Sequence, residues 1–178
     1  MGPLEMTPLL KKLRREPLCD PKGTAEVVDY GRQDIERILP HRDPFLLIDG
    51  IDRVDVKERT IRGHRRMSPD DPVFGGHFPK TPVYPGVLQV EMTGQLGLCL
   101  VHFIGHRTHR ITEDAAPADV RALRVHHAQY LLPVVPGDLV EVHAALVEED
   151  AMTATCAGQV VRDGKVASFA VQEVYFVE

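Results

Sequence analysis

The chain contains few cysteines, and they form no motif. Its 178 residues include only Cys19, Cys99 and Cys156, and no two of them stand in a CxxC pair. An odd number of cysteines at wide spacings favours neither a disulfide framework nor a zinc ribbon. A reducing cytoplasm is therefore the expected compartment. The chain also lacks an excess of positive charge, and its net charge of −5 argues against nucleic acid as its main partner.

Long apolar runs are missing as well. We expect no stretch to be long enough to cross a bilayer, and therefore no membrane partner. A basic cluster lies at residues 11–15, but no apolar stretch follows it, which argues against a secretory signal. The composition, with 43% hydrophobic and 26% charged residues, is typical of a folded globular domain.

The first 32 residues are expected to be an N-terminal extension of a domain at 33–178. Thr7-Pro8 is predicted to start a helix, because proline suits the first helical position. Leu9, Leu10 and Leu13 would give that helix one apolar side. Such a segment could pack on the domain or bind a partner, and a docked or frayed arm is the simpler interpretation.

The remaining sequence predicts strands, one long helix and then more strands. Asp34 is expected to cap a short helix at 35–39, and a loop rich in proline and glycine is expected at 68–85. The helix predicted at 87–103 is apolar on nearly all sides, which is typical of a buried helix. Asp163-Gly164 predicts a tight hairpin turn. Strands are expected at 45–56, 58–67, 120–132, 138–148, 152–161 and 165–176.

This order of elements predicts an α+β fold in which a curved antiparallel sheet wraps round a long central helix. A sheet of this kind leaves an outer face and two edges to be covered. Dimerisation through an edge strand is one way to cover an edge.

The residues that point to chemistry lie where the loop at 68–85 meets the long helix. His77 lies in the loop and could act as a base near neutral pH. Glu91 lies about one and a half turns into the helix, where an apolar surround would raise the pKa of its carboxyl group and let it donate a proton. Gly86 would offer a backbone N–H at the helix N-terminus to a thioester carbonyl. A base, an acid and such a donor suit the elimination of water, although a lone histidine and glutamate are more often structural.

The segment at 76–91 resembles the signature G-H-F-P-x-x-P-V-x-P-G-V-L-x-x-E of the 3-hydroxyacyl-[acyl-carrier-protein] dehydratases of the FabZ type. Residues 39–47 are similar to an upstream element of this family, L-P-H-R-x-P-F-L-L, and residues 133–138 to its downstream P-V-x-P-G-D turn. The resemblance covers residues 33–178. It implies a hot-dog fold and the dehydration of a 3-hydroxyacyl thioester to a trans-2-enoyl thioester, in fatty-acid or polyketide-type biosynthesis.

The resemblance also implies roles for residues and partners. His77 and Glu91 match the catalytic pair, which meets across a homodimer interface, and Gly86 matches the glycine that holds the thioester carbonyl. The substrate would be carried on phosphopantetheine of an acyl carrier protein or on coenzyme A, with no further cofactor and no metal, and a trimer of dimers is known in the family. The candidates for the substrate tunnel are Phe78, Val87, Gln95 and Leu123. Glutamate at 91, where the related dehydratase-isomerases have aspartate, favours dehydration without isomerisation.

Several alternatives stay open at this point. His102, His106 and His109 have helical spacing, but a helix end and a polar loop explain them better than a metal does. His41 is interpreted equally well as structural or as lining the site entrance. The chain could also be a hot-dog thioesterase, an enoyl-CoA hydratase or a non-catalytic member that binds acyl chains or a carrier protein. A basic patch for an acidic carrier could be formed by Arg42, Arg65, Arg66, Arg121 and Arg124, although ordinary solvated arginines are the simpler interpretation.

Overall fold

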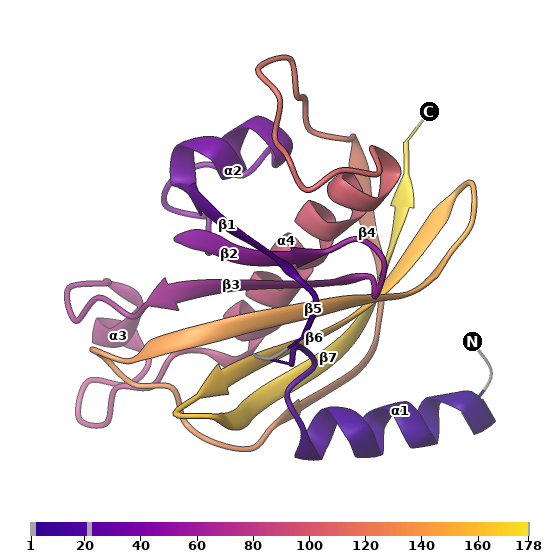
Figure 1. Ribbon diagram of the computed structural model, residues 1–178. Helices are drawn as coiled ribbons and strands as arrows, with labels where there is room; N and C mark the ends of the chain where they lie inside the picture. The colour runs from indigo at the N-terminus through magenta and orange to yellow at the C-terminus, as the bar shows by residue number, and fades with distance from the viewer. Residues whose placement is uncertain (1–2, 21–22, 178) are drawn as a thin grey trace.

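Seven strands form one antiparallel sheet that curves around a long helix, as Figure 1 shows. The structure is a computed structural model that describes residues 3–20 and 23–177. The strands are β1 (Glu26–Gly31), β2 (Gly50–Asp55), β3 (Thr60–Arg66), β4 (Val120–Tyr130), β5 (Leu139–Glu149), β6 (Thr153–Arg162) and β7 (Lys165–Phe176). Their order across the sheet is β1-β2-β3-β5-β6-β7-β4, so β1 and β4 are its edges. The predicted α+β architecture is confirmed.

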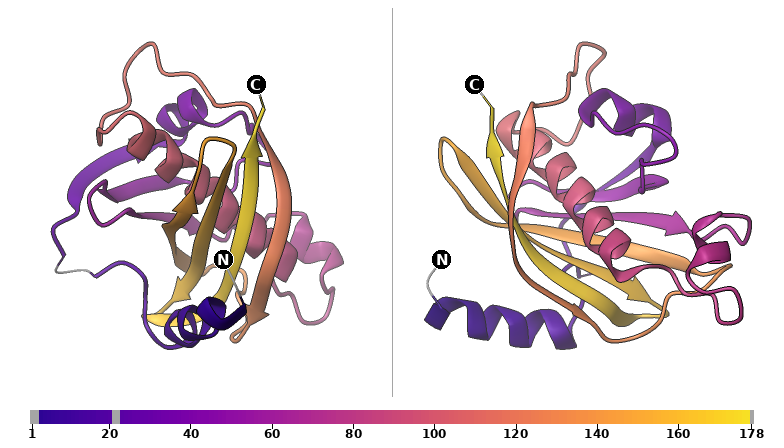
Figure 2. Two further views of the ribbon diagram at one scale, coloured as in Figure 1. Left: turned by 90° about the vertical axis from the view of Figure 1, so that its right-hand side faces the viewer. Right: turned by 180° about the vertical axis from the view of Figure 1, so that it is seen from behind.

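Helix α4 (Gly86–Gly105) crosses the concave face of the sheet, as the view from behind in Figure 2 shows. Met92, Leu96, Leu100 and Phe103 on this helix are fully buried in the main core. The helix approaches β6 closely, because a Cβ atom on Gly158 would lie only 2.4 Å from the Cβ atom of Thr93. Glycine is therefore needed at this crossing of helix and strand.

Judged by length and composition alone, one helix could span a bilayer, so the expectation that no stretch is long enough is wrong. Helix α4 has 20 residues and is apolar enough to meet that criterion. Half of the most apolar part of this helix is buried inside the molecule, against the sheet. A core helix of a globular protein has this composition because it is covered on most sides by apolar neighbours.

The first predicted strand begins later than expected. Phe45 to Asp49 are not part of a strand, and β2 starts at Gly50. Leu46, Leu47 and Ile48 are buried, which accounts for the apolar pattern in the sequence. The backbone here is held by a helix side chain, since the carboxamide of Gln95 bonds the N–H of Leu47 and the C=O of Phe45.

Other differences concern short elements. Helix α2 (Arg32–Ile38) starts before Asp34, whose carboxylate instead reaches back to the N–H of Gly31 at 3.1 Å. The loop at 68–85 contains the short helix α3 (Val73–Gly76), and β1, within the predicted extension, was not anticipated. The hairpin turn is confirmed, because Asp163 and Gly164 have φ angles of 50° and 71°, as a type I′ turn requires.

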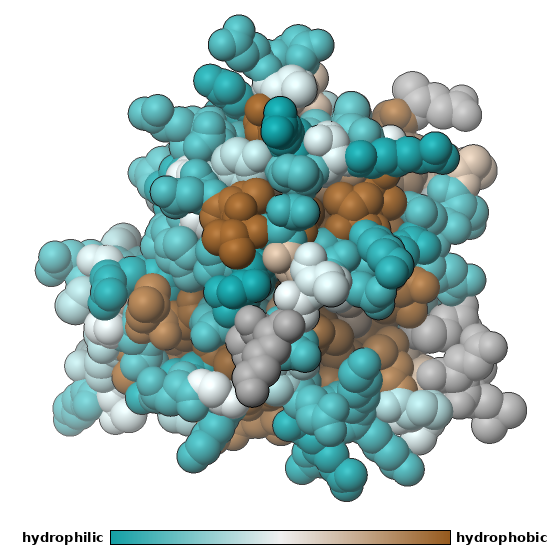
Figure 3. Space-filling model, in the orientation of Figure 1, coloured by the Kyte–Doolittle hydropathy of each residue, from teal (hydrophilic) through white to brown (hydrophobic). Residues whose placement is uncertain are grey.

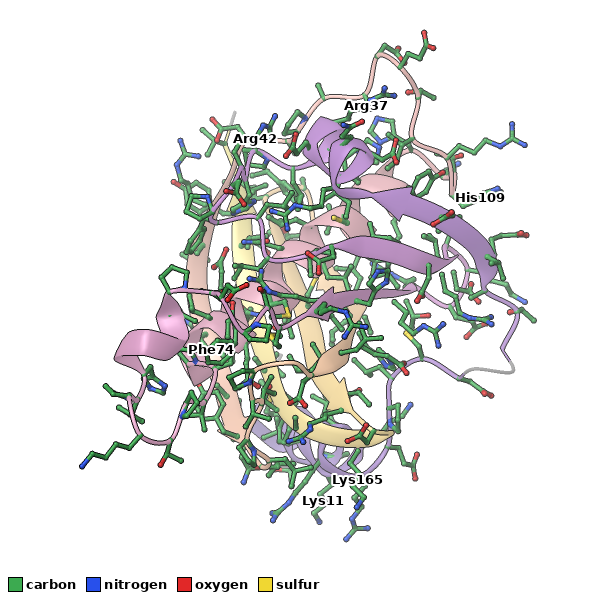
Figure 4. The ribbon with its side chains drawn as sticks, turned by 90° about the vertical axis from the view of Figure 1, so that its left-hand side faces the viewer. Lys11, Arg37, Arg42, Phe74, His109 and Lys165 are labelled. Atoms are coloured by element: carbon green, nitrogen blue, oxygen red, sulfur yellow. The ribbon has the colours of Figure 1, made fainter. Side chains whose placement is uncertain are left out.

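Helix α1 (Pro3–Arg15) packs on the outer face of the sheet, opposite α4. It begins before the predicted start and contains Pro8 in its interior, where proline has no backbone N–H to donate. The predicted apolar side is confirmed, because Leu13 is fully buried against Phe169 and Val171, with Leu9 and Leu10 around it. Elsewhere on the outer face, apolar side chains reach the surface as separate patches (Figure 3). Figure 4 shows Lys11 of α1 and Lys165 of β7 at the same end of the molecule.

The side chain of Gln159 on β6 fixes the end of α1. Its Nε2 donates to the carbonyl oxygens of Leu13 and Glu16 at 2.6 and 2.8 Å, and its Oε1 accepts from the N–H of Leu18 at 2.7 Å. The last carbonyls of a helix have no partner within it, and here a buried amide supplies one.

Cys19, which follows this helix end, donates its backbone N–H to Nδ1 of His143. Burial raises the pKa of the Cys19 thiol to about 12.

The substitution Gln159→Ala is expected to release α1 from the sheet. Three backbone groups lose their partner, which lowers the free energy of unfolding by about 1–3 kcal/mol. Hydrogen exchange of the amides at 9–19 should accelerate, and urea denaturation should show the loss of stability. Lys11→Ala, on the exposed side of the same helix, is the matched control. Unchanged exchange in Gln159→Ala would contradict this account of the docking.

Candidate active site

The loop that carries His77 fixes the orientation of the imidazole ring. The backbone N–H of His77 donates to the carbonyl of Val73 at 2.9 Å, and its carbonyl accepts from Val83 N–H at 2.9 Å. The ring atom Nδ1 lies 2.9 Å from the carbonyl oxygen of Val83. A carbonyl oxygen can only accept, so Nδ1 carries the proton. In the neutral ring the lone pair is then on Nε2, the atom that can act as a base.

Aromatic and ionic contacts hold the rest of this loop. Tyr84 is buried, with the ring of Phe74 at 5.9 Å and the Arg65 guanidinium 5.5 Å from its centroid. Arg65 also pairs with Asp71 at 3.3 Å. The N–H of Tyr84 donates to the carbonyl of Val134 at 2.7 Å. The sequence segments at 76–91 and 133–138 therefore meet in space, and Figure 4 labels Phe74 in this region.

Glu91 lies on α4, and two donors converge on one of its oxygen atoms. Nε2 of Gln95 donates to Oε1 at 2.9 Å, and Nε2 of His41 lies 3.4 Å from the same atom. The hydrogen bond from His41 is the largest effect on the carboxyl group, and together with the one from Gln95 it lowers the pKa of Glu91 below its usual value, against the opposing effect of burial.

The expectation that an apolar surround raises the pKa of Glu91 is therefore wrong for the single chain. The side chain of Glu91 is still 35% exposed, so the penalty for burying its charge is incomplete. Sequence reasoning left the role of His41 open. The only signal for it was its place in the L-P-H-R element, and its contact with Glu91 could not be derived from spacing along the chain.

Gln95 bonds three groups at this site, two in the segment at 45–47 and one on its own helix. Its Oε1 accepts from the N–H of Leu47 at 2.8 Å, while its Nε2 donates both to the carbonyl of Phe45 and to Glu91, each at 2.9 Å. The residue is buried, so each of these bonds replaces one that water would have made. Gln95 therefore fixes the upstream element and the carboxylate relative to each other.

His77 and Glu91 line different cavities within one chain. The His77 cavity has a volume of about 510 Å³ and is also lined by Pro85, Gly86, Val87 and Tyr130. The Glu91 cavity has a volume of about 180 Å³, and its lining includes His41, Gln95, Leu98 and the β4 residues Ala122, Arg124 and Val125. One chain thus presents the His77 imidazole and the Glu91 carboxylate in two separate hollows that are both partly lined by β4.

The other predicted site residues are placed as follows. Gly86 begins α4, and a Cβ atom there would lie 2.5 Å from Cε1 of Tyr130, so the close approach of this ring requires glycine. Val87 lines the His77 cavity and is 70% exposed, and Gln95 lines the Glu91 cavity. Phe78 stacks on the His77 ring with centroids 4.0 Å apart and is 54% exposed. Leu123 is 49% exposed at a bulge in β4, and neither Phe78 nor Leu123 lines these two cavities.

Several of the arginines and histidines weighed for other roles have partners of their own. Arg65 is occupied with Tyr84 and Asp71, and Arg121 pairs with Asp119. The rings of His102 and His106 lie 4.3 Å apart at the end of α4. Among the residues that the structure describes, no three His, Cys, Asp or Glu side chains gather in a way that could hold a metal ion.

A strongly curved antiparallel sheet around one long central helix defines the hot-dog class of proteins. Within this class the chain belongs to the FabA-like family, because residues 39–170 match the family model for the FabA-like domain. The sequence is 39% identical over 127 residues to the 3-hydroxyacyl-[acyl-carrier-protein] dehydratase FabZ of Methylobacterium sp. (strain 4-46), covering 68% of this chain and 72% of that protein. It is 31% identical to the dehydratase of the same name from a Nitratiruptor species, covering 82% of this chain and 96% of that protein.

Solved structures support the fold alone. The dehydratase heterocomplex ApeI:P from Xenorhabdus doucetiae contains a chain with a TM-score of 0.60 and 18% identity, covering 81% of this chain and 91% of that one. A hypothetical thioesterase protein with coenzyme A from Streptococcus pneumoniae TIGR4 has a TM-score of 0.54 and 11% identity, covering 71% of this chain and 84% of that one. The fold is therefore shared by proteins named for different reactions, and the site must distinguish them.

The lowered pKa of Glu91 predicts a pH-dependent contribution to stability. A carboxyl group with a lowered pKa in the folded state stabilises the fold above its unfolded pKa of about 4.3, and this contribution is lost as the pH falls through the folded value. The wild type is therefore expected to exceed Glu91→Gln in free energy of unfolding at pH 6, with the difference shrinking below about pH 4. Urea denaturation across this range measures it, and Glu113→Gln, an exposed site, is the control. A difference that grows on acidification would contradict the direction of the pKa shift.

Proposed function

We propose that this protein dehydrates 3-hydroxyacyl thioesters carried by an acyl carrier protein, forming trans-2-enoyl thioesters. Two side chains support this proposal most directly. His77 has Nε2 free to accept a proton, and the Glu91 carboxyl group has Gln95 and His41 beside one of its oxygen atoms. The family relationship and the relatives named as dehydratases support the same reaction class. The reaction would take place in the cytoplasm, with the substrate on phosphopantetheine and with no further cofactor.

The proposed reaction divides the two proton transfers between these groups. Nε2 of His77 takes a proton from C2 of the substrate, and the electron pair forms the double bond between C2 and C3. The bond from C3 to oxygen breaks as the protonated Glu91 carboxyl gives its proton to the leaving hydroxyl, which departs as water. The backbone N–H at Gly86 stabilises the charge that develops on the thioester oxygen, and lies where the dipole of α4 adds to this effect.

Because His77 and Glu91 line different cavities, a second chain would have to complete the site if both groups act on one substrate. Strand β4 is an uncovered edge with apolar side chains half exposed to water, among them Leu123, Val125 and Tyr130. Beside it, α4 leaves a stripe that is not fully buried, formed by Val87, Glu91, Gly94, Leu98 and Val101. Positions at alternating spacings of four and three residues share one face of a helix, which suits burial against a partner. We propose that a second copy of the chain covers this face.

Symmetry gives this pairing a direct consequence. Two copies that join through their β4 edges about a twofold axis pair antiparallel, so the end at Tyr130 of one copy lies beside the start at Val120 of the other. Tyr130 lines the His77 cavity, whereas Val120, Ala122 and Val125 line the Glu91 cavity. Edge pairing therefore brings the His77 cavity of one copy to the Glu91 cavity of the other. Each dimer would contain two composite sites, and three such dimers could assemble further.

Mixed dimers test the activity and the shared site together. His77→Ala and Glu91→Ala should each lose about 10²–10⁴-fold in turnover of 3-hydroxyacyl carrier-protein substrates. In a mixed dimer one site lacks both groups and the other has both. A randomly reassociated mixture should therefore regain about a quarter of the wild-type activity, and purified mixed dimers about half. Loss of water is followed by mass spectrometry.

Each outcome of the mixing experiment is informative. Variants that dehydrate at the wild-type rate would contradict the roles of His77 and Glu91. Inactive variants that stay inactive when mixed would contradict the shared site. Hydrolysis of acyl thioesters by the wild type in place of dehydration would favour a thioesterase, and an unchanged biological role of His77→Ala would favour a non-catalytic binding protein. His64→Ala, away from both cavities, is the control for folding and assembly.

A further cavity, distinct from the His77 cavity, adjoins the Glu91 cavity and suits the distal part of the acyl chain. It has a volume of about 420 Å³ and shares Pro40, Leu98 and Val120 with the Glu91 cavity. Most of its remaining lining is apolar, and it ends near His102 and His106. We propose that the acyl tail runs from Glu91 past Leu98 along α4, rather than past Leu123, which lines neither cavity.

Narrowing the junction of these two cavities should change the chain-length preference. Leu98→Trp is expected to lower the ratio of kcat/KM for long-chain to that for short-chain 3-hydroxyacyl substrates about tenfold or more, because only long chains pass residue 98. The ratio is the readout because residue 98 also lies on the face proposed for pairing, where a bulky side chain could lower both rates together. Competition between two chain lengths in one reaction measures the ratio directly. Leu123→Trp is the matched comparison, and a larger effect from Leu123→Trp would place the tail elsewhere.

A further inference from the structure

We propose that His41 is a positioning residue for Glu91, and that its ring and the Gln95 carboxamide hold Oε1 so that Oε2 faces the leaving hydroxyl. This inference rests on the proposed function, because it assigns a task within the same reaction. It concerns a histidine that would not itself exchange a proton with the substrate. The arrangement of donors around the carboxylate is the observation that carries it.

The two oxygen atoms of Glu91 are in different situations. Oε1 accepts from Nε2 of Gln95 at 2.9 Å and lies 3.4 Å from Nε2 of His41. Within the described part of the chain, no hydrogen bond or ion pair involves Oε2. The hydrogen bond from Gln95 and the contact with His41 both engage Oε1, which restricts rotation of the carboxylate and leaves Oε2 to face the substrate. The carboxylate also lies in the cavity proposed for the substrate.

The second ring nitrogen of His41 has no partner. Nδ1 is buried and makes no hydrogen bond among the described residues. A proton on Nδ1 would be a buried N–H without an acceptor, which costs free energy. The tautomer with its proton on Nε2 suits this site, because Nε2 then presents its N–H to Oε1 of Glu91 at 3.4 Å.

The backbone around His41 is built to hold the ring in place. Nη1 of Arg42 donates to the carbonyl oxygens of Leu39 and His41, both at 2.8 Å. The carbonyl of Arg42 in turn accepts from the N–H groups of Phe45 and Leu46 at 2.7 and 2.9 Å. Arg42, labelled in Figure 4, thus closes the turn that presents His41 to the helix. This turn is tied to α4 again through Gln95 and Phe45.

For the reaction, this arrangement stabilises the Glu91 carboxylate that remains after proton transfer. When Glu91 gives its proton to the leaving hydroxyl, negative charge develops on its carboxylate. The N–H of Gln95 already bonds Oε1 and the His41 ring lies close to it, so the charge is stabilised with little reorganisation, which lowers the barrier. The same donors account for the direction of the pKa shift of Glu91. The other titratable groups that line this cavity are Arg124, Cys156 and Glu173.

The test compares two replacements of similar size in the full-length protein. His41→Leu removes the donor, whereas His41→Gln keeps an N–H that can reach Oε1. For His41→Leu we expect kcat to fall about ten- to a hundredfold with KM unchanged, as for the loss of a hydrogen bond to a charged group. The carboxyl pKa of Glu91, followed by carbon-13 NMR, should rise in His41→Leu. His41→Gln should restore most of the rate and most of the pKa shift, and His64→Ala is the control.

The outcomes separate this inference from the proposed function. A wild-type rate in His41→Leu overturns the inference and leaves the proposed function intact. A glutamine variant as slow as the leucine variant, with an unmoved Glu91 pKa, also overturns it, because the role would then be structural. A wild type without dehydratase activity overturns both. Thermal melting verifies the fold, and if His41→Leu does not fold, His41→Asn, which is polar but too short to reach Oε1, takes its place with the same expectations.

Discussion

The carboxamide of Gln95 is the interaction on which the arrangement of the site depends. It is a buried side chain on the central helix, and its hydrogen bonds reach two backbone positions of the segment before β2 and the carboxylate one turn earlier on α4. An amide has a fixed set of donors and acceptors, so these three bonds determine how the segment after α2 lies on the helix. The position of His41 follows, since it belongs to that segment.

A second constraint comes from the curvature of the sheet. The sheet covers most of α4 but not the stripe that contains Glu91, and its last strand β4 ends the sheet beside that stripe. An exposed edge with apolar side chains is costly for a lone chain, because both its backbone groups and its side chains remain unpaired with protein. The proposed second copy would remove this cost by covering the edge, and would join two half-sites in the same step. In this protein, assembly and activity would therefore have the same structural cause.

The sequence predicted those parts of the molecule that depend on local pattern. The long helix was predicted because its residues are apolar on nearly every side, and the β6–β7 turn because only a few residues adopt two consecutive positive φ angles. Strand β1 was missed, since its exposed and half-buried positions give weak alternation, and Phe45 to Asp49 resembled a strand because buried leucines look the same beside a sheet or beside a helix. His77 and Glu91 were selected from a motif. The pairing of Glu91 with His41, which is distant along the sequence, required the folded chain.

The lowered pKa of Glu91 in one chain is compatible with the proposed site shared by two chains. In the single chain the carboxylate meets two N–H donors and remains partly in water, and both conditions favour its charged form. A second copy and an acyl chain over the same cavity would exclude the water but leave the donors in place. Burial opposes the effect of the donors on this carboxyl group, and more complete burial would favour the protonated form that the leaving hydroxyl needs. Once that proton has gone, the same two donors stabilise the carboxylate. Opposing effects on one group can thus serve successive steps of a single turnover.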